Sequence, residues 1–364
     1  MTLVSGGMPL PGFKLEGGEF VQLPPLRATD ATFRTLVGED GRPLDPALEA
    51  ERRRRVLGAF ARSRPDVVVT ETYPFGRRAL RFELEPLIEA ARAATPRPAL
   101  VASIRDILVA KPDPAKRRAM IERFQADYDL VLVHADPRLI RLEASLPEAT
   151  ELAGRIHYTG FVAPTAPAPA AGPAAGTKAA VPAGEVVVSA GGGVVGAALL
   201  RAALDARPRT RLAATPWRLI TGRNLPQHEF AALMRDAAGC DAGDGVTIER
   251  FRPDLPALFA RAALSISQAG YNTAVELLQA GTPMVLVPFA EAAETEQTVR
   301  ARLLTAAGAA EMVEAEALDP ATLASAVDRA VDGAMDRLRA ALAIDFDGAR
   351  NAARTILQLA AAGS

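Results

Sequence analysis

The sequence predicts an α/β protein with two parallel-sheet domains that face each other across a cleft. A chain of 364 residues is longer than one hydrophobic core usually supports. Short β-branched runs alternate with longer helical stretches in both halves, which is typical of βαβ units. Residues 164–184 are rich in Pro, Ala and Gly and have no hydrophobic period. We therefore expect an N-terminal domain over 1–163, a linker over 164–184 and a C-terminal domain with a helical tail over 185–364.

The N-terminal half contains four apolar runs with the length and composition of strands. These predicted strands are Thr2–Val4, Asp66–Thr70, Ala99–Ile104 and Leu130–His134. Longer stretches with helical spacing of apolar residues separate these four strands. These predicted helices are Leu48–Ser63, Leu80–Ala94 and Asp113–Tyr128.

The same alternation follows the linker and predicts a second parallel sheet. The predicted strands are Glu185–Ser189, Arg218–Thr221, Val246–Glu249, Leu264–Ser267 and Met284–Val287. The predicted helices are Val194–Ala206, Gln227–Ala238 and Thr273–Gln279. A largely helical tail is expected beyond Asp319.

Composition excludes several classes of function. Lys and Arg number 42 against 43 Asp and Glu, so the basic surplus of a nucleic-acid binder is missing. One cysteine, Cys240, allows no intrachain disulfide, and three histidines argue against a histidine-rich metal site. The sequence has neither an apolar run long enough to span a membrane nor a secretory signal, so we expect a cytoplasmic protein. The arginine run Arg52–Arg55 is expected on a solvated helix face, with contact to anionic lipid headgroups as the alternative.

A glycine-rich turn follows the first strand of the C-terminal half. Gly191, Gly192 and Gly193 come between the strand VVVSA and a helix, where backbone N–H groups can approach an anion. The spacing also fits a dinucleotide-binding loop, but such a site for NAD needs an acidic residue about twenty positions later. The second strand instead ends near Arg223, which disfavours NAD and leaves an NADP site open. The alternative is that this glycine-rich turn has only a structural role and binds no ligand.

A second motif, SQAGYNTAVE, lies at the end of the strand Leu264–Ser267. Gly270 forms a turn, and a helix is expected to begin near Asn272 or Thr273, whose side chains can cap it or bind a phosphate. Glu276 lies one turn later on the same face as Thr273, where a carboxylate suits the vicinal hydroxyls of a ribose. The alternative is that Thr273 and Glu276 form a capping pair.

The run SQAGYNTAVELLQAGTPMVLVPF resembles the C-terminal, nucleotide-sugar-binding domain of family 28 glycosyltransferases. This family includes the N-acetylglucosaminyltransferase of peptidoglycan synthesis. The whole chain resembles a bacterial group of predicted glycosyltransferases through the phrases VQLPPLRA, TETYPFGRRALRFEL, ASIRDILV and VLVHADP. The resemblance implies a GT-B architecture, with two Rossmann-like domains and the active site in the cleft. It also implies a UDP-sugar substrate and a reaction that needs no metal ion and no cofactor.

The resemblance assigns a role to each matching position of the donor site. It implies that Glu276 binds the donor ribose, that Phe251 packs against the uracil, and that Glu296 and Gln297 read the sugar hydroxyls. This sequence has ETEQ where an acidic-x-Gln-Gln form is common, so the identity of the sugar is open. The loop around the diphosphate would comprise Ser267, Gln268, Gly270, Asn272 and Thr273, with Gly191, Gly192 and Gly193 on the opposite wall.

Three successive strands of the N-terminal half end in charged or polar residues. Glu71, Arg105 and His134 follow these strands, at the edge where parallel sheets bind ligands. Glu71, Arg77 and Arg105 are the candidates for the acceptor side, because arginines bind a phosphate or carboxylate in a bidentate way. Glu71 and His134 are also candidates for the catalytic base.

The strand TLVSGG resembles the second strand of the family, so we expect roughly forty further residues, a strand, loop and helix, upstream of Met1.

The expected reaction is inverting transfer of a hexosyl or N-acetylhexosaminyl group from a UDP-sugar to an acceptor hydroxyl. The acceptor is expected to be a small molecule, a glycan or a lipid-linked molecule, with peripheral membrane contact as a further expectation. The alternatives are a UDP-sugar 2-epimerase, a non-catalytic nucleotide-sugar-binding protein and an NADP oxidoreductase.

Overall fold

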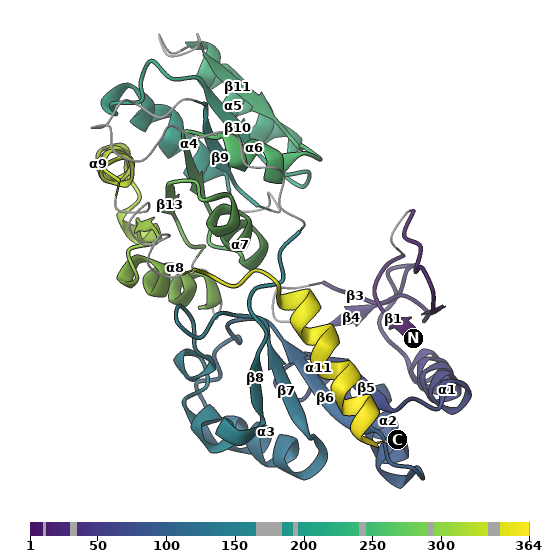
Figure 1. Cartoon of the computed structure of the whole chain (residues 1–364). Helices are drawn as coiled ribbons and strands as arrows, with labels where there is room; N and C mark the ends of the chain where they lie inside the picture. Colours follow the sequence, from purple (N-terminus) through teal and green to yellow (C-terminus); the bar gives the residue numbers. More distant parts are fainter. Residues whose placement is uncertain are drawn as a thin grey trace. The chain divides into compact units, whose positions relative to one another are not determined.

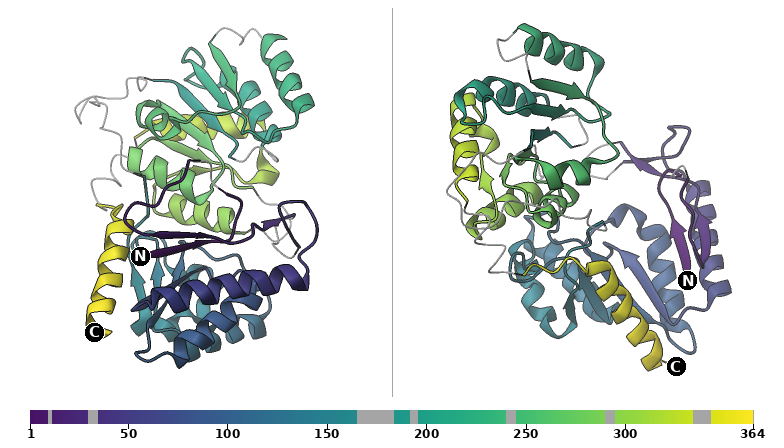
Figure 2. Two further views of the ribbon diagram at one scale, coloured as in Figure 1. Left: turned by 90° about the vertical axis from the view of Figure 1, so that its right-hand side faces the viewer. Right: turned by 45° about the horizontal axis from the view of Figure 1, so that its top comes forward.

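The computed structural model divides the chain into two compact units (Figures 1 and 2). It describes residues 1–9, 12–29, 35–164, 184–191, 196–239, 245–289, 295–333 and 343–363. Unit 1 comprises Met1–Val133, Leu146–Tyr158 and Arg350–Ser364, and unit 2 comprises His134–Ser145 and Thr159–Ala349. No helix in these ranges has both the length and the apolar character needed to cross a membrane.

Unit 1 is built on a four-stranded parallel sheet in the order β5-β6-β7-β8. Its strands are β5 (Val67–Glu71), β6 (Ala99–Ile104), β7 (Leu130–Val133) and β8 (Ile156–Tyr158). A separate parallel pair joins β1 (Thr2–Ser5) to β2 (Glu19–Gln22), and an antiparallel pair joins β3 (Arg27–Ala28) to β4 (Leu36–Val37). The helices are α1 (Pro46–Ser63), α2 (Arg81–Ala93), α3 (Pro114–Asp127) and α11 (Gly348–Gly363), with short 3-10 segments η1 (Arg78–Leu80) and η3 (Pro147–Arg155).

Helix α1 begins after Asp45, whose carboxylate accepts a hydrogen bond from the N–H of Leu48, and Pro46 occupies its first turn. The expectation that the whole arginine run of this helix is solvated is wrong for Arg52, which is 0% exposed. Its guanidinium forms two hydrogen bonds, of 2.8 and 2.7 Å, to the carboxylate of Glu83 on α2. Sequence periodicity cannot identify such a residue, because its partner lies 31 positions away.

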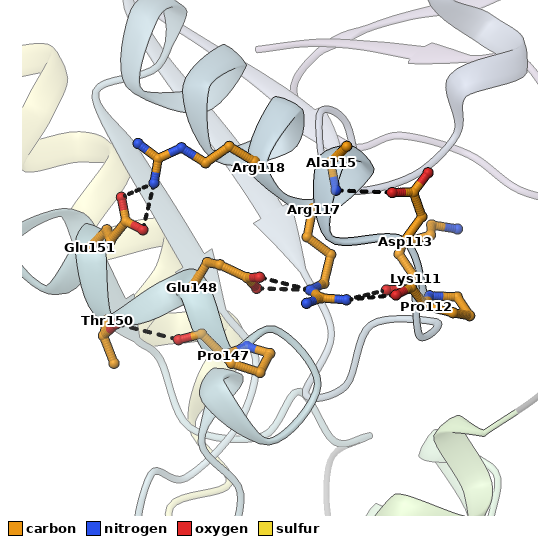
Figure 3. Close-up of polar contacts among 10 residues, drawn as sticks. All are labelled: Lys111, Pro112, Asp113, Ala115, Arg117, Arg118, Pro147, Glu148, Thr150 and Glu151. Atoms are coloured by element: carbon orange, nitrogen blue, oxygen red, sulfur yellow. Dashed lines mark hydrogen bonds and ion pairs between the residues drawn. The ribbon is translucent and has the colours of Figure 1, made fainter.

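Ion pairs connect α3 to η3, where the chain re-enters unit 1 (Figure 3). The Nε of Arg117 lies 2.8 and 3.0 Å from the two carboxylate oxygens of Glu148, and its Nη1 donates to the carbonyl of Lys111 at 2.7 Å. Arg118 donates to both oxygens of Glu151 at 2.7 Å. These contacts fix the position of η3 against α3, because each arginine is held at more than one atom.

Unit 2 contains a six-stranded parallel sheet in the order β11-β10-β9-β12-β13-β14. The strands are β9 (Val186–Ser189), β10 (Trp217–Ile220), β11 (Val246–Glu249), β12 (Leu264–Ser267), β13 (Met284–Leu286) and β14 (Glu311–Met312). In order along the chain, these are the third, second, first, fourth, fifth and sixth strands of the unit. This is the doubly wound Rossmann order, which reverses direction between β9 and β12.

The helices of unit 2 cover both faces of this sheet, which is why β9 and β12 are buried along their whole length. Apolar residues of α4 and α9 form one core with the residues of β9 and β12. The helices are α4 (Ala197–Ala206), α5 (Gln227–Gly239), α6 (Leu255–Arg261), α7 (Tyr271–Ala280), α8 (Glu296–Ala306) and α9 (Pro320–Val331). The predicted α/β class with parallel sheets is therefore confirmed. That the two domains face each other across a cleft stays a prediction.

The two units differ from the predicted domain boundaries at two places. The C-terminal helix α11 belongs to unit 1, because Ala352, Ile356 and Leu359 pack with Val101 and Leu132 of its sheet. An amphipathic pattern predicts a helix but does not show which sheet its apolar face will cover. The segment His134–Ser145 belongs to unit 2. Most of the predicted linker, residues 165–183, lies outside the described residues.

Candidate functional site

Two loops meet at the carboxyl edge of the unit 2 sheet, where the strand order reverses. β9 and β12 end in register at Ser189 and Ser267, and the N–H of Gln268 donates to the carbonyl of Ser189 at 3.3 Å. Gly191 has φ +61°, and a Cβ atom there would lie 3.1 Å from Oε1 of Gln268. Doubly wound sheets bind ligands at this point. Gly192 and Gly193 lie outside the described residues.

Helix α7 presents an uncapped N-terminus beside these loops. Gly270 is its N-cap and has no side chain to bind the first turn, and the N–H of Ala274 donates to the carbonyl of Gly270 at 2.9 Å. The N–H groups of Asn272 and Thr273 donate no hydrogen bond to any described residue. Free N–H groups and the helix dipole together favour an anion at this end. Helix α7 begins at Tyr271, one residue before Asn272, which agrees with the predicted start near Asn272 or Thr273. The capping-pair alternative is wrong, because the N-cap is Gly270 and no side chain caps the helix.

Glu276 lies on α7, one turn beyond the free N–H groups. Its side chain is half-buried, and burial raises the pKa of its carboxyl group. Within the described ranges, no hydrogen bond or ion pair engages this carboxylate. A carboxylate in such a place can bind a ligand that donates hydrogen bonds, as vicinal hydroxyls do. Ser267 differs, because it is fully buried and its Oγ lies 2.7 Å from the Oγ of Ser265, inside the sheet.

Helix α8 contacts the loop before α7 through Gln297. Its Oε1 accepts hydrogen bonds from the N–H of Ala269 at 3.1 Å and from the N–H of Phe289 at 3.2 Å. Glu296, its neighbour, lies 3.8 Å from Arg300 Nη1. Sequence reasoning missed Arg300, which is buried and donates to the carbonyl of Ala269 at 2.6 Å. No helix was predicted over Glu296–Ala306, so no local pattern marked this arginine as buried.

Phe251 and Arg223 lie beyond the carboxyl ends of β11 and β10. Phe251 is 48% exposed, and the guanidinium carbon of Arg223 lies 3.5 Å from the centre of its ring. A planar cation over an aromatic ring is a stable cation–π arrangement. The pair therefore forms a flat, exposed surface that can stack against a nucleobase.

The acceptor-side candidates lie in unit 1. Glu71 is the last residue of β5, and its carboxylate accepts a hydrogen bond of 3.0 Å from Arg77. Both side chains are exposed, as is Arg105, which follows β6. Thr72 and Arg77 have φ values of +67° and +51°, so the turn after β5 has a strained backbone.

His134 lies in unit 2 and contacts the first residue of α7. The hydroxyl of Tyr271 donates to the carbonyl of His134 at 3.0 Å. The Nδ1 of His134 lies 2.9 Å from the Oγ1 of Thr159, which itself donates to the carbonyl of Gly160. In the tautomer that carries its proton on Nδ1, the ring donates to Thr159 and Nε2 is the basic atom. Burial lowers the pKa of His134, so the ring is neutral at pH 7. In the part of the chain that the structure describes, acidic, histidine and cysteine side chains form no cluster that could hold a metal ion.

The C-terminal half of the chain, which contains the α7 motif, matches a glycosyltransferase family. Residues 186–356 match the model described as "Glycosyltransferase family 28 C-terminal domain". The predicted resemblance of the motif is therefore confirmed for this half of the chain. The matched region contains every donor-site candidate that the sequence pointed to, from Gly191 to Gln297.

Two curated relatives have the name "UDP-N-acetylglucosamine--N-acetylmuramyl-(pentapeptide) pyrophosphoryl-undecaprenol N-acetylglucosamine transferase". The relative from Exiguobacterium is 31% identical over 173 residues, which is 48% of this chain and 46% of the relative. The relative from Brucella canis is 33% identical over 150 residues, 38% of this chain and 40% of the relative. The chain thus spans less than half the length of these relatives.

Solved glycosyltransferase structures share the fold. Os79 from O. sativa, in complex with UDP, has a TM-score of 0.59 at 16% identity, covering 100% of this chain and 93% of that chain. MurG from Acinetobacter baumannii has a TM-score of 0.54 at 16% identity, covering 89% and 80%. These similarities confirm the predicted GT-B-like fold with two Rossmann-like domains.

Proposed function

We propose that this protein is a glycosyltransferase that transfers a hexosyl or N-acetylhexosaminyl group from a UDP-sugar to an acceptor hydroxyl. The observation that carries the proposal is the arrangement of α7 at the point where the sheet reverses direction. An uncapped helix N-terminus suits a diphosphate, and the unpaired carboxylate of Glu276 one turn later suits a ribose. The family 28 match over residues 186–356 and the names of the curated relatives support this assignment.

The reaction would be a direct displacement at the anomeric carbon, which inverts its configuration. As the bond to UDP breaks, negative charge develops on the diphosphate. The free N–H groups of Asn272 and Thr273 and the Gly191 loop would stabilise this charge without a metal ion. The exposed Phe251 ring with its Arg223 partner would pack against the uracil, and Gln297 and Glu296 would face the sugar.

The acceptor hydroxyl needs a general base. His134 is suited to this role because burial keeps its imidazole neutral at pH 7, with Nε2 as the basic atom. Glu71 is the alternative base, although its carboxylate already binds Arg77. Arg77 and Arg105 are proposed to bind a phosphate or carboxylate of the acceptor, which would be a small molecule, a glycan or a lipid-linked molecule.

Calorimetric titration tests the donor site. UDP is expected to bind the wild type, and Glu276→Ala should weaken it roughly ten- to a hundredfold, because a hydrogen bond to a charged group contributes about 1.5–3 kcal/mol. The control Glu316→Ala removes an exposed carboxylate elsewhere in unit 2 and should leave UDP affinity unchanged. NADPH should not bind. Tight binding of NADPH without binding of UDP would overturn the proposal, and turnover of a UDP-sugar without an acceptor would indicate an epimerase instead.

A further inference from the structure

Two side chains of α8 bind both main-chain polar groups of Ala269. The carboxamide oxygen of Gln297 accepts the N–H of Ala269 at 3.1 Å, and Nη1 of Arg300 donates to its carbonyl at 2.6 Å. Gln297 and Arg300 are three positions apart, so they lie on the same face of the helix. Ala269 itself is fully buried, one residue before the N-cap of α7. One helix face therefore fixes the peptide groups that lead into the free N-terminus.

Arg300 is a costly residue at this place. Its side chain is 1% exposed, and removal of a guanidinium from water is unfavourable unless its contacts compensate. Besides its hydrogen bond to Ala269, Nη1 of Arg300 lies 3.8 Å from Oε1 of Glu296. The guanidinium carbon lies 5.8 Å from the centre of the Tyr271 ring. The guanidinium is therefore confined beside the carbonyl of Ala269.

The orientation of the Gln297 amide is fixed by its partners. Two backbone N–H groups, of Ala269 and Phe289, point at the same atom, and only the oxygen can accept both. Phe289 lies in the loop after β13. Gln297 thus ties the loop after β12 to the loop after β13, and Arg300 holds the first of these loops from its carbonyl side.

We propose that Arg300 and Gln297 are positioning residues that hold the Gln268–Gly270 loop, and with it the N-terminus of α7, in the geometry that receives a diphosphate. This inference rests on the proposed function and deepens it. Hydrogen-bond donors stabilise developing charge effectively only when they are held in place before the reaction, within about 0.5 Å of the productive geometry. The buried cation also adds positive charge directly behind the loop that would face the phosphates.

The test compares Arg300→Met and Arg300→Lys with the control Arg302→Met. Arg302 lies on the same helix but is exposed and paired with Glu314, so its loss should change nothing at the loop. Arg300→Met should weaken UDP roughly ten- to a hundredfold while leaving uridine affinity, measured by ligand-observed NMR, unchanged. Arg300→Lys retains a donor and should recover part of the loss. A variant that merely destabilised the unit would weaken UDP and uridine alike.

Hydrogen exchange of the ligand-free protein separates this inference from the proposed function. Arg300→Met should speed amide exchange in the segment 268–273, whereas Arg302→Met should not. If exchange there stays at the wild-type rate, or if UDP and uridine weaken equally, the inference is overturned. If the wild type fails to bind UDP, the proposed function fails, and exchange alone decides whether Arg300 holds the loop. Should Arg300→Met not fold, Gln297→Met provides the same two readouts.

Discussion

Removal of Arg52 is expected to destabilise unit 1 strongly, although this arginine belongs to a run that looks solvent-exposed in the sequence. Arg52 is 0% exposed and joins α1 to α2 through Glu83, whose side chain is 4% exposed. Its Nη1 also donates to the carbonyl of Gly6 at 3.1 Å and to the carbonyl of Pro24. Arg52→Met retains most of the side-chain volume but removes every one of these donors.

The expected cost follows from what remains buried after the substitution. The carboxylate of Glu83 would lose its counter-ion, and breaking a buried ion pair in this way costs about 3–5 kcal/mol of the free energy of unfolding. For a unit of this size, each kcal/mol of lost stability lowers the melting temperature by about 2–4 °C. Arg52→Met should therefore lower the melting temperature by roughly 6–20 °C. The double variant Arg52→Met/Glu83→Leu leaves no unpaired charge and should recover at least half of the lost free energy.

Urea unfolding followed by far-UV circular dichroism measures the free energy, and hydrogen exchange of α1 and α2 peptides locates the effect. The matched control is Arg53→Met, one residue along α1, where the side chain is exposed. It should change the free energy of unfolding by no more than about 0.5 kcal/mol. The reasoning would be refuted if Arg52→Met unfolded within about 1 kcal/mol of this control, or if the double variant were less stable than the single one.

Three further predictions concern the donor site and the first helix. Burial raises the pKa of Glu276 above its ordinary value of 4.5. The ribose hydroxyls are proposed to bind the charged carboxylate, so UDP affinity should fall as the pH drops through that raised pKa. Calorimetry from pH 8 downward checks this, and Glu276→Gln should remove the dependence. Excess EDTA should leave UDP affinity unchanged, because α7 and the Gly191 loop are proposed to stabilise the diphosphate charge without a metal ion. A tenfold loss of UDP affinity would contradict that proposal. Asp45→Ala removes the N-cap bond to Leu48 and should cost about 0.5–2 kcal/mol in urea unfolding.

Local sequence patterns predicted the strands β9 and β12 and the helix α7 of the donor site, but not the helix α8. The runs that became β9 and β12, VVVS and LSIS, are short and followed by glycine-containing turns, which is enough to place strand, turn and helix. The short strands β3, β4 and β14 were not predicted, because two residues carry no period. The start of α7 at Tyr271 agrees with the prediction, but the good capping residues Asn272 and Thr273 do not cap the helix, because Gly270 is its N-cap.

The sequence by itself determined the α/β class, the family 28 resemblance of the C-terminal half and the residues of the α7 motif. These features depend on neighbours in the chain, so periodicity and turn chemistry reveal them. The tertiary structure decided which charged residues are buried and which peptide groups they hold. Arg52 meets Glu83 across 31 positions, and Arg300 meets Ala269 across 31 positions. The cost of burying a charge is set by partners brought together only by folding, and no local pattern records them.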